Sequence, residues 1–87
     1  MKVTLNEIEQ AFDLIINEKK SREDIALWAI KFQSAEDNGK LEYDPPSEED
    51  KIWDGIQYLT GVDLLDNDRI YFHSVKNFVD FRDENGL

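Results

Sequence analysis

The chain has 87 residues, of which 20 are acidic and 10 basic, giving a net charge of −10 at pH 7. This length suits one small domain, and a single helical domain is expected over residues 1–87. No cysteine and one histidine are present, which excludes disulfides, thiolate metal sites and a zinc site with several histidines. The acidic balance argues against nucleic acid or a membrane surface as partner.

Two antiparallel helices are expected in the first half of the chain. The first begins at a capping box of Thr4 and Glu7 and extends to about residue 18. The second begins at Ser21, a favourable N-cap residue, and ends at Asn38-Gly39. Their expected buried stripes, at three- and four-residue spacing, are Leu5, Ile8, Ala11, Phe12, Ile15 and Ile16, then Ile25, Trp28, Ala29 and Phe32, widened by Leu27 and Ile30.

The second half begins with a loop over residues 37–46, because Pro45 and Pro46 forbid helix there. Ser47 is expected to cap a third helix, and Ser74 a fourth. Between them, residues 62–72 are compatible with a short β-hairpin or with an irregular loop. The expected fold is mostly α, a small four-helix bundle-like domain. The buried residues expected in its last two helices are Ile52, Trp53, Ile56 and Leu59, then Val75, Phe78, Val79 and Phe81.

Negative charge is concentrated in the middle of the chain. Residues 37–68 hold ten acidic and two basic residues and sum to −8, whereas residues 1–36 sum to −2 and residues 69–87 to zero. A concentrated field of one sign accelerates association with a partner of the other sign. The residues expected to bind such a partner are Asp37, Glu42, Tyr43, Asp44, Asp50 and Asp54. Helix caps and turns account for part of the excess, and Tyr43 is also compatible with a residue that covers the core.

The residues do not indicate an enzyme. His73 and Ser74 are adjacent, but no glycine elbow or oxyanion-hole motif accompanies them, and Ser74 suits a helix cap. Asp63, Asp66 and Asp68 lack the glycine and glutamate that an EF-hand calcium loop needs. No phosphate-binding glycine loop is present either. We expect no catalysis, no metal and no cofactor.

Several motifs together resemble a known family. They are Ser21-Arg22-Glu23, Leu27-Trp28-Ala29, Ile52-Trp53-Asp54, residues 59–64 and residues 70–74, with Phe78 and Phe81. Over residues 20–82 the chain resembles small acidic bacterial immunity proteins that accompany contact-dependent or polymorphic toxins. Phe81 departs from the pattern, because many such relatives have tryptophan there. The matching positions are core aromatics and turns, so they carry over no contact residues.

The resemblance implies a cytoplasmic protein that neutralises a cognate toxin domain, often a cationic nuclease, by forming a stoichiometric complex. Its oligomeric state is left open. A different class of function is also compatible with the residues. The alternative is a small acidic regulatory or adaptor protein, or a DNA mimic, that docks on a basic protein surface.

Overall fold

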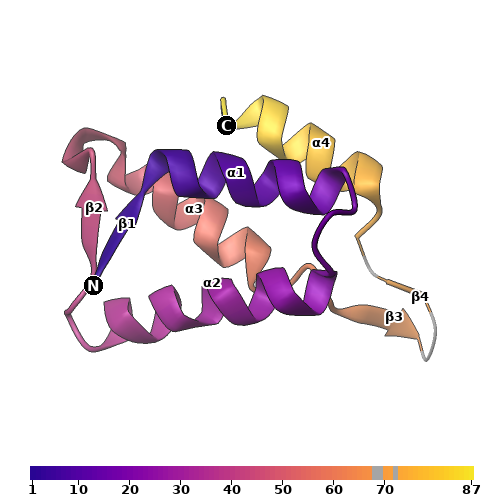
Figure 1. Ribbon diagram of the computed structural model, residues 1–87, viewed down its shortest axis with the longest axis horizontal. Helices are drawn as coiled ribbons and strands as arrows, with labels where there is room; N and C mark the ends of the chain where they lie inside the picture. The colour runs from indigo at the N-terminus through magenta and orange to yellow at the C-terminus, as the bar shows by residue number, and fades with distance from the viewer. Residues whose placement is uncertain (68–69, 72) are drawn as a thin grey trace.

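The computed structural model describes residues 1–67, 70–71 and 73–87. Within them four α-helices form most of the molecule: α1 (Leu5–Ile16), α2 (Arg22–Asp37), α3 (Glu49–Leu59) and α4 (Val75–Glu84). The short elements are β1 (Lys2–Thr4), β2 (Glu42–Asp44), the 3-10 helix η1 (Pro46–Glu48), β3 (Leu65–Asn67) and β4 (Ile70–Tyr71). The expected mostly helical, four-helix fold is confirmed (Figure 1).

Three of the expected helix caps are present. The hydroxyl of Thr4 accepts a hydrogen bond from the Glu7 amide at 3.1 Å, and the Glu7 carboxylate accepts one from the Thr4 amide at 3.1 Å, which completes the capping box. Ser21 and Ser74 cap α2 and α4 by accepting from the backbone amides three residues later, at 3.1 and 3.2 Å. These side chains satisfy amides that a helix leaves unpaired at its start.

The expected cap at Ser47 is wrong. Ser47 lies inside η1, and the residue that precedes α3 is Glu48, which makes no side-chain capping bond. The reason is the proline pair: Pro46 has a backbone angle suited to the first position of a helical turn, so the turn begins before Ser47.

The helices enclose one apolar core. Helices α1 and α2 run in opposite directions, as expected, and α3 crosses behind them while α4 lies beside α1 (Figure 1). Trp28 and Trp53 are half-buried and pack against the core. The expected stripe of α2 is too wide, however, because Leu27 is 67% exposed and Ile30 42% exposed. The buried core consists of Val3, Ile8, Ala11, Phe12, Ile15, Ile25, Ala26, Ala29, Phe32, Ile52, Ile56, Leu59, Val62 and Phe78.

A small parallel sheet joins the start of the chain to its middle. Strand β1 pairs with β2 in the register Lys2 with Glu42, Val3 with Tyr43 and Thr4 with Asp44. The expectation of a loop over residues 37–46 is therefore corrected at β2. Three residues are too few to show an alternating pattern, and the partner strand lies about 40 residues away in the sequence.

The open question over residues 62–72 is answered by a hairpin, because β3 and β4 pair antiparallel. Of the turn residues expected there, Asp68 lies outside the described residues. No helix in the described part of the chain is long and apolar enough to cross a membrane.

Candidate nucleic-acid interface

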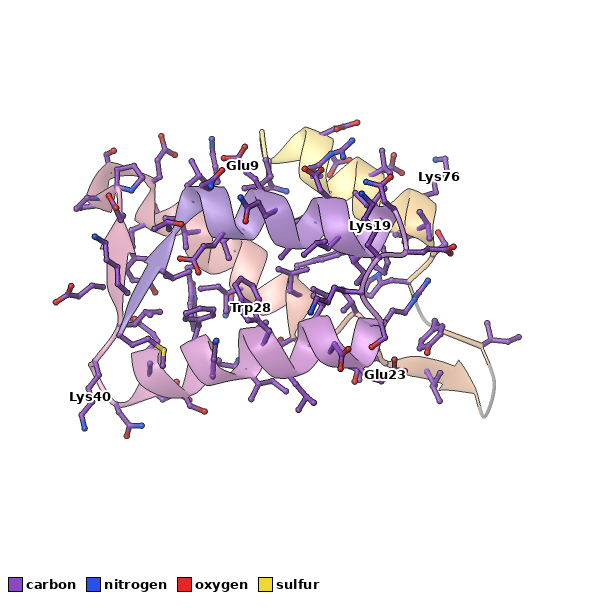
Figure 2. All side chains as sticks on the ribbon, in the orientation of Figure 1. Glu9, Lys19, Glu23, Trp28, Lys40 and Lys76 are labelled. Carbon is purple, nitrogen blue, oxygen red and sulfur yellow. The ribbon has the colours of Figure 1, made fainter. Side chains whose placement is uncertain are left out.

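The two ends of the molecule carry different charges. Carboxylates gather at the end formed by β2, η1, the C-terminus of α2 and the start of α3, which we call the acidic end; they are Glu36, Asp37, Glu42, Asp44, Glu48, Glu49 and Asp50. Cations gather at the opposite end, where α2 and α4 begin. We call this the lysine end, and it comprises Lys19, Lys20, Arg22 and Lys76. Figure 2 places Lys19, Glu23 and Lys76 at one end and Lys40 at the other, along a longest dimension of 36 Å.

Most of the residues expected to bind a partner lie at the acidic end. Glu42 and Asp44 are on β2, and Asp44 forms an ion pair with Lys2 at 3.4 Å. Asp37 is the last residue of α2, and it is exposed. Asp50 and Asp54 are exposed and lie one turn apart on α3. The fold thus brings together residues from three elements, while Asp54 lies further along α3 than the others.

Tyr43 packs inward. It is half-buried, lies against the core, and its hydroxyl donates a hydrogen bond to Glu36 at 3.0 Å. Burial, followed by the bond to Glu36, raises the pKa of Tyr43 well above its ordinary range. Together with Leu41, Glu42, Pro46 and Glu49 it lines a shallow hollow of about 400 Å³.

The lysine end surrounds a second hollow, of about 330 Å³. Residues from the α1–α2 connection, the hairpin and α4 line it: Ile15, Glu18, Lys19, Lys20, Ser21, Arg22, Glu23, Tyr71 and Val75. Lys19 and Lys20 are exposed, and the Lys76 side chain is 83% exposed in spite of its ion pair with Asp80 at 3.2 Å. Helices α2 and α4 both begin here, and the starts of helices favour anions. The arrangement can therefore hold phosphate groups.

Arg22 contacts several segments at the lysine end. Its guanidinium donates to the carbonyl oxygens of Val62, at 3.4 Å, and of His73. It also stacks over the rings of Tyr71 and Phe78, at 4.1 and 4.8 Å from their centroids. Arg22 is half-buried, so it acts mainly on the shape of the lysine end, while the exposed lysines are free to approach a ligand.

Glu23 opposes anion binding at this end. Its carboxylate accepts a hydrogen bond from the Tyr71 hydroxyl at 2.6 Å. That bond, followed by one from its own backbone, lowers the pKa of Glu23, and the same bond raises the pKa of Tyr71. Glu23 therefore stays ionised. The cations of the lysine end must outweigh it together with Glu18, which lines the same hollow, Asp24, which lies in the first turn of α2, and Asp80, which pairs with Lys76.

Sequence reasoning missed the lysine end. Summing charge along the chain hides it, because Lys19, Lys20 and Arg22 alternate with Glu18, Glu23 and Asp24. The run Lys19-Lys20-Ser21-Arg22 before a helix was the available signal. Lys76 could not have been added from the sequence, because only the fold brings the start of α4 to this end.

The chain is similar to a protein outside the family that the motifs suggested. The chain is 31% identical over 67 residues to the uncharacterized protein YxzC of Bacillus subtilis (strain 168), covering 77% of the chain and 49% of that protein. The chain thus spans about half the length of the curated relative it matches. No solved structure matches the chain.

Residues 3–84 match the family described as YxzC DNA-binding protein. The resemblance to immunity proteins is therefore wrong, and so is the toxin partner that it implied. Core aromatics and turns carried that resemblance, and such residues specify packing and not a partner. The family description also contradicts the exclusion of nucleic acid, which rested on sums of charge along the chain. Matched over nearly its whole length, the chain belongs to the YxzC DNA-binding protein family.

Proposed function

We propose that the protein is a small regulatory protein that binds DNA through the lysine end. The family description supports DNA as the ligand. The observation that carries the proposal is the separation of charge along the molecule: exposed lysines and two helix starts at one end, and most of the carboxylates of the middle segment at the other. We propose further that it works in the cytoplasm and acts by binding, without catalysing a reaction.

The distance between the two ends explains how a protein with a net negative charge can bind DNA. At physiological salt, charges more than about 8 Å apart are largely screened from each other. The longest dimension of the molecule is 36 Å, which is several screening lengths. Phosphates at the lysine end would therefore interact with the nearby lysines far more strongly than with the acidic end.

The expected contact is small. The lysine end has three exposed cations, Lys19, Lys20 and Lys76, and a fourth, Arg22, that is half-buried. Phosphate contacts position a protein on DNA without reading the sequence of bases. The binding expected from this end alone is weak, sensitive to salt and only slightly dependent on DNA sequence.

Fluorescence anisotropy of a labelled DNA duplex at low salt tests the proposal. The double variant Lys19→Gln, Lys20→Gln should bind at least about tenfold more weakly than the wild type, because two phosphate contacts are lost. Lys40→Gln is the control for position, since it removes one lysine charge at the opposite end (Figure 2), whereas the double variant removes two at the lysine end. A loss of binding free energy in Lys40→Gln half as large as that in the double variant would mean that only the net charge matters, and no binding by the wild type would reject the proposal.

The acidic end supports a second candidate, in which the protein is an adaptor that docks on a basic surface of another DNA-bound protein. The seven carboxylates there, of which Glu42 and Glu49 line the same hollow as Tyr43, favour a cationic partner. The two functions separate experimentally. An adaptor would show no DNA affinity alone, and Glu42→Gln with Asp50→Asn would weaken its retention on a complex of DNA and protein, whereas the two lysine substitutions would not.

A further inference from the structure

We infer that the outward face of α2, together with the β3–β4 hairpin, joins two copies of this chain in a homodimer. The face is apolar and exposed. It consists of Leu27, Ile30, Leu64, Leu65, Ile70 and Tyr71, which are 67, 42, 58, 52, 59 and 37% exposed. We call it the apolar face. The inference goes beyond DNA binding and does not depend on it.

The hairpin and α2 adjoin each other at Tyr71. The Tyr71 hydroxyl bonds to Glu23 at 2.6 Å, which holds the hairpin against the first turn of α2. Leu27 lies one helical turn beyond Glu23 on the same side of α2, and Ile30 follows it. An exposed patch of about 300–600 Å² is the largest that a typical monomer shows, and larger ones mark interaction sites. Six exposed large apolar side chains on one helix and the adjoining hairpin are more than the singly scattered ones that a monomer ordinarily shows.

Charge on α2 indicates that a second copy is the occupant. Glu23 lies four residues before Leu27, and Lys31 lies four residues after it, and all three are exposed. If two α2 helices cross antiparallel about a two-fold axis at Leu27, each Glu23 meets the partner's Lys31. Two-fold symmetry repeats this pair, so one face complements itself.

The charge of the whole molecule favours the same arrangement. Antiparallel α2 helices bring the lysine end of one copy toward Asp37, at the C-terminus of α2 in the other, and keep the two acidic ends apart. The hairpin of each copy then lies over the second half of α2 in its partner, near Ile30. A basic protein would gain more at the acidic end than at this face, which has few carboxylates.

The arrangement has a regulatory consequence, and this consequence alone rests on the proposed function. The lysine end would face either the partner copy or DNA. Dimerisation and DNA binding should therefore compete, so that DNA lowers the fraction of dimer.

Sedimentation equilibrium of variants with exchanged charges tests the inference. Glu23→Lys and Lys31→Glu should each weaken dimerisation at least about fivefold, because each places like charges opposite one another twice in the dimer. The double variant Glu23→Lys, Lys31→Glu should restore it, and so should an equimolar mixture of the two single variants. A chain that has the mass of one copy at about 1 mM, or a failure of both combinations to restore the dimer, would overturn the inference.

A second measurement does not require the charged variants to fold. The natural chain has no cysteine, so a single introduced cysteine reports on proximity alone. Leu27→Cys should be joined rapidly into dimers by a short bis-maleimide reagent, whereas Asn6→Cys, an exposed position on α1, should not. Equal cross-linking at both positions would contradict an interface at Leu27.

Discussion

Arg22 connects the start of α2 to the hairpin, to the segments that flank it and to α4. It donates to two backbone carbonyls, of Val62 and His73, and stacks on two rings. Hydrogen bonds from a charged group contribute about 1.5–3 kcal/mol each, and a cation–π contact about 0.5–1 kcal/mol. The bond to Val62 is long, at 3.4 Å, and methionine keeps part of the packing on the two rings, so the loss should be smaller than the sum of these contributions. We predict that Arg22→Met lowers the free energy of unfolding by about 2–3 kcal/mol, measured by urea denaturation.

Two controls accompany this prediction. Arg22→Lys keeps the charge but loses the planar fork, so it should recover only a minor part of the stability. Lys20→Met, two residues away and exposed, should change the free energy of unfolding by less than about 0.5 kcal/mol. A loss at Arg22→Met no larger than that at Lys20→Met would show that the contacts of Arg22 do not hold the hairpin.

Tyr43 gives the protein a dependence on alkaline pH. Its pKa is raised in the folded state by burial and by the bond to Glu36. The unfolded chain therefore loses the phenolic proton first, at about pH 10. The contribution of this group is fully present below about pH 10 and is lost as the pH rises beyond it.

We predict that Tyr43→Phe makes the fall in stability above about pH 10 shallower, as measured by urea midpoints between pH 8 and 11. The pKa values of Tyr58 and Tyr71 are raised as well, so part of the fall should persist in the variant. Between pH 6 and 8 the two proteins should respond to pH alike. Parallel curves above pH 10 would contradict the role given to Tyr43.

At the scale of the elements, Ser74 and Ser47 allow the contribution of a helix cap to be measured against a matched control. Both precede or begin a helical segment in the sequence, but only Ser74 accepts a hydrogen bond from a helix amide. Ser74→Ala should lower the free energy of unfolding by about 1 kcal/mol. Ser47→Ala should change it by less than about 0.5 kcal/mol. Similar losses in the two variants would show that the Ser47 hydroxyl also caps a helix.

The elements show which features local sequence can predict. Caps and apolar stripes act within one or two turns, and on this basis Thr4, Ser21 and Ser74 were located correctly. The pairing of β1 with β2 could not be predicted, because it joins residues 2–4 to residues 42–44. The outward position of Leu27 and Ile30 was missed for a related reason. A stripe on one helix does not show how much of it other helices cover.

At the scale of the whole molecule, the sequence predicted the acidic segment but not the place of the cations. The charge of residues 37–68 is visible along the chain, and the fold keeps most of it at one end. The lysine end combines the α1–α2 connection with the start of α4, more than 50 residues later. A sum over the chain cannot detect such a cluster of cations. The exclusion of nucleic acid, which the family description contradicts, rested on such a sum.

The salt dependence of DNA binding tests the central claim most directly. The slope of log K against log salt concentration reports the number of phosphates contacted, at about 0.9 per contact. We predict a slope of about −2 to −4 for the wild type, reduced in magnitude by about 2 in Lys19→Gln, Lys20→Gln and unchanged in Lys40→Gln. A wild-type slope near zero, or the same slope in the wild type and the double lysine variant, would contradict DNA binding through the lysine end.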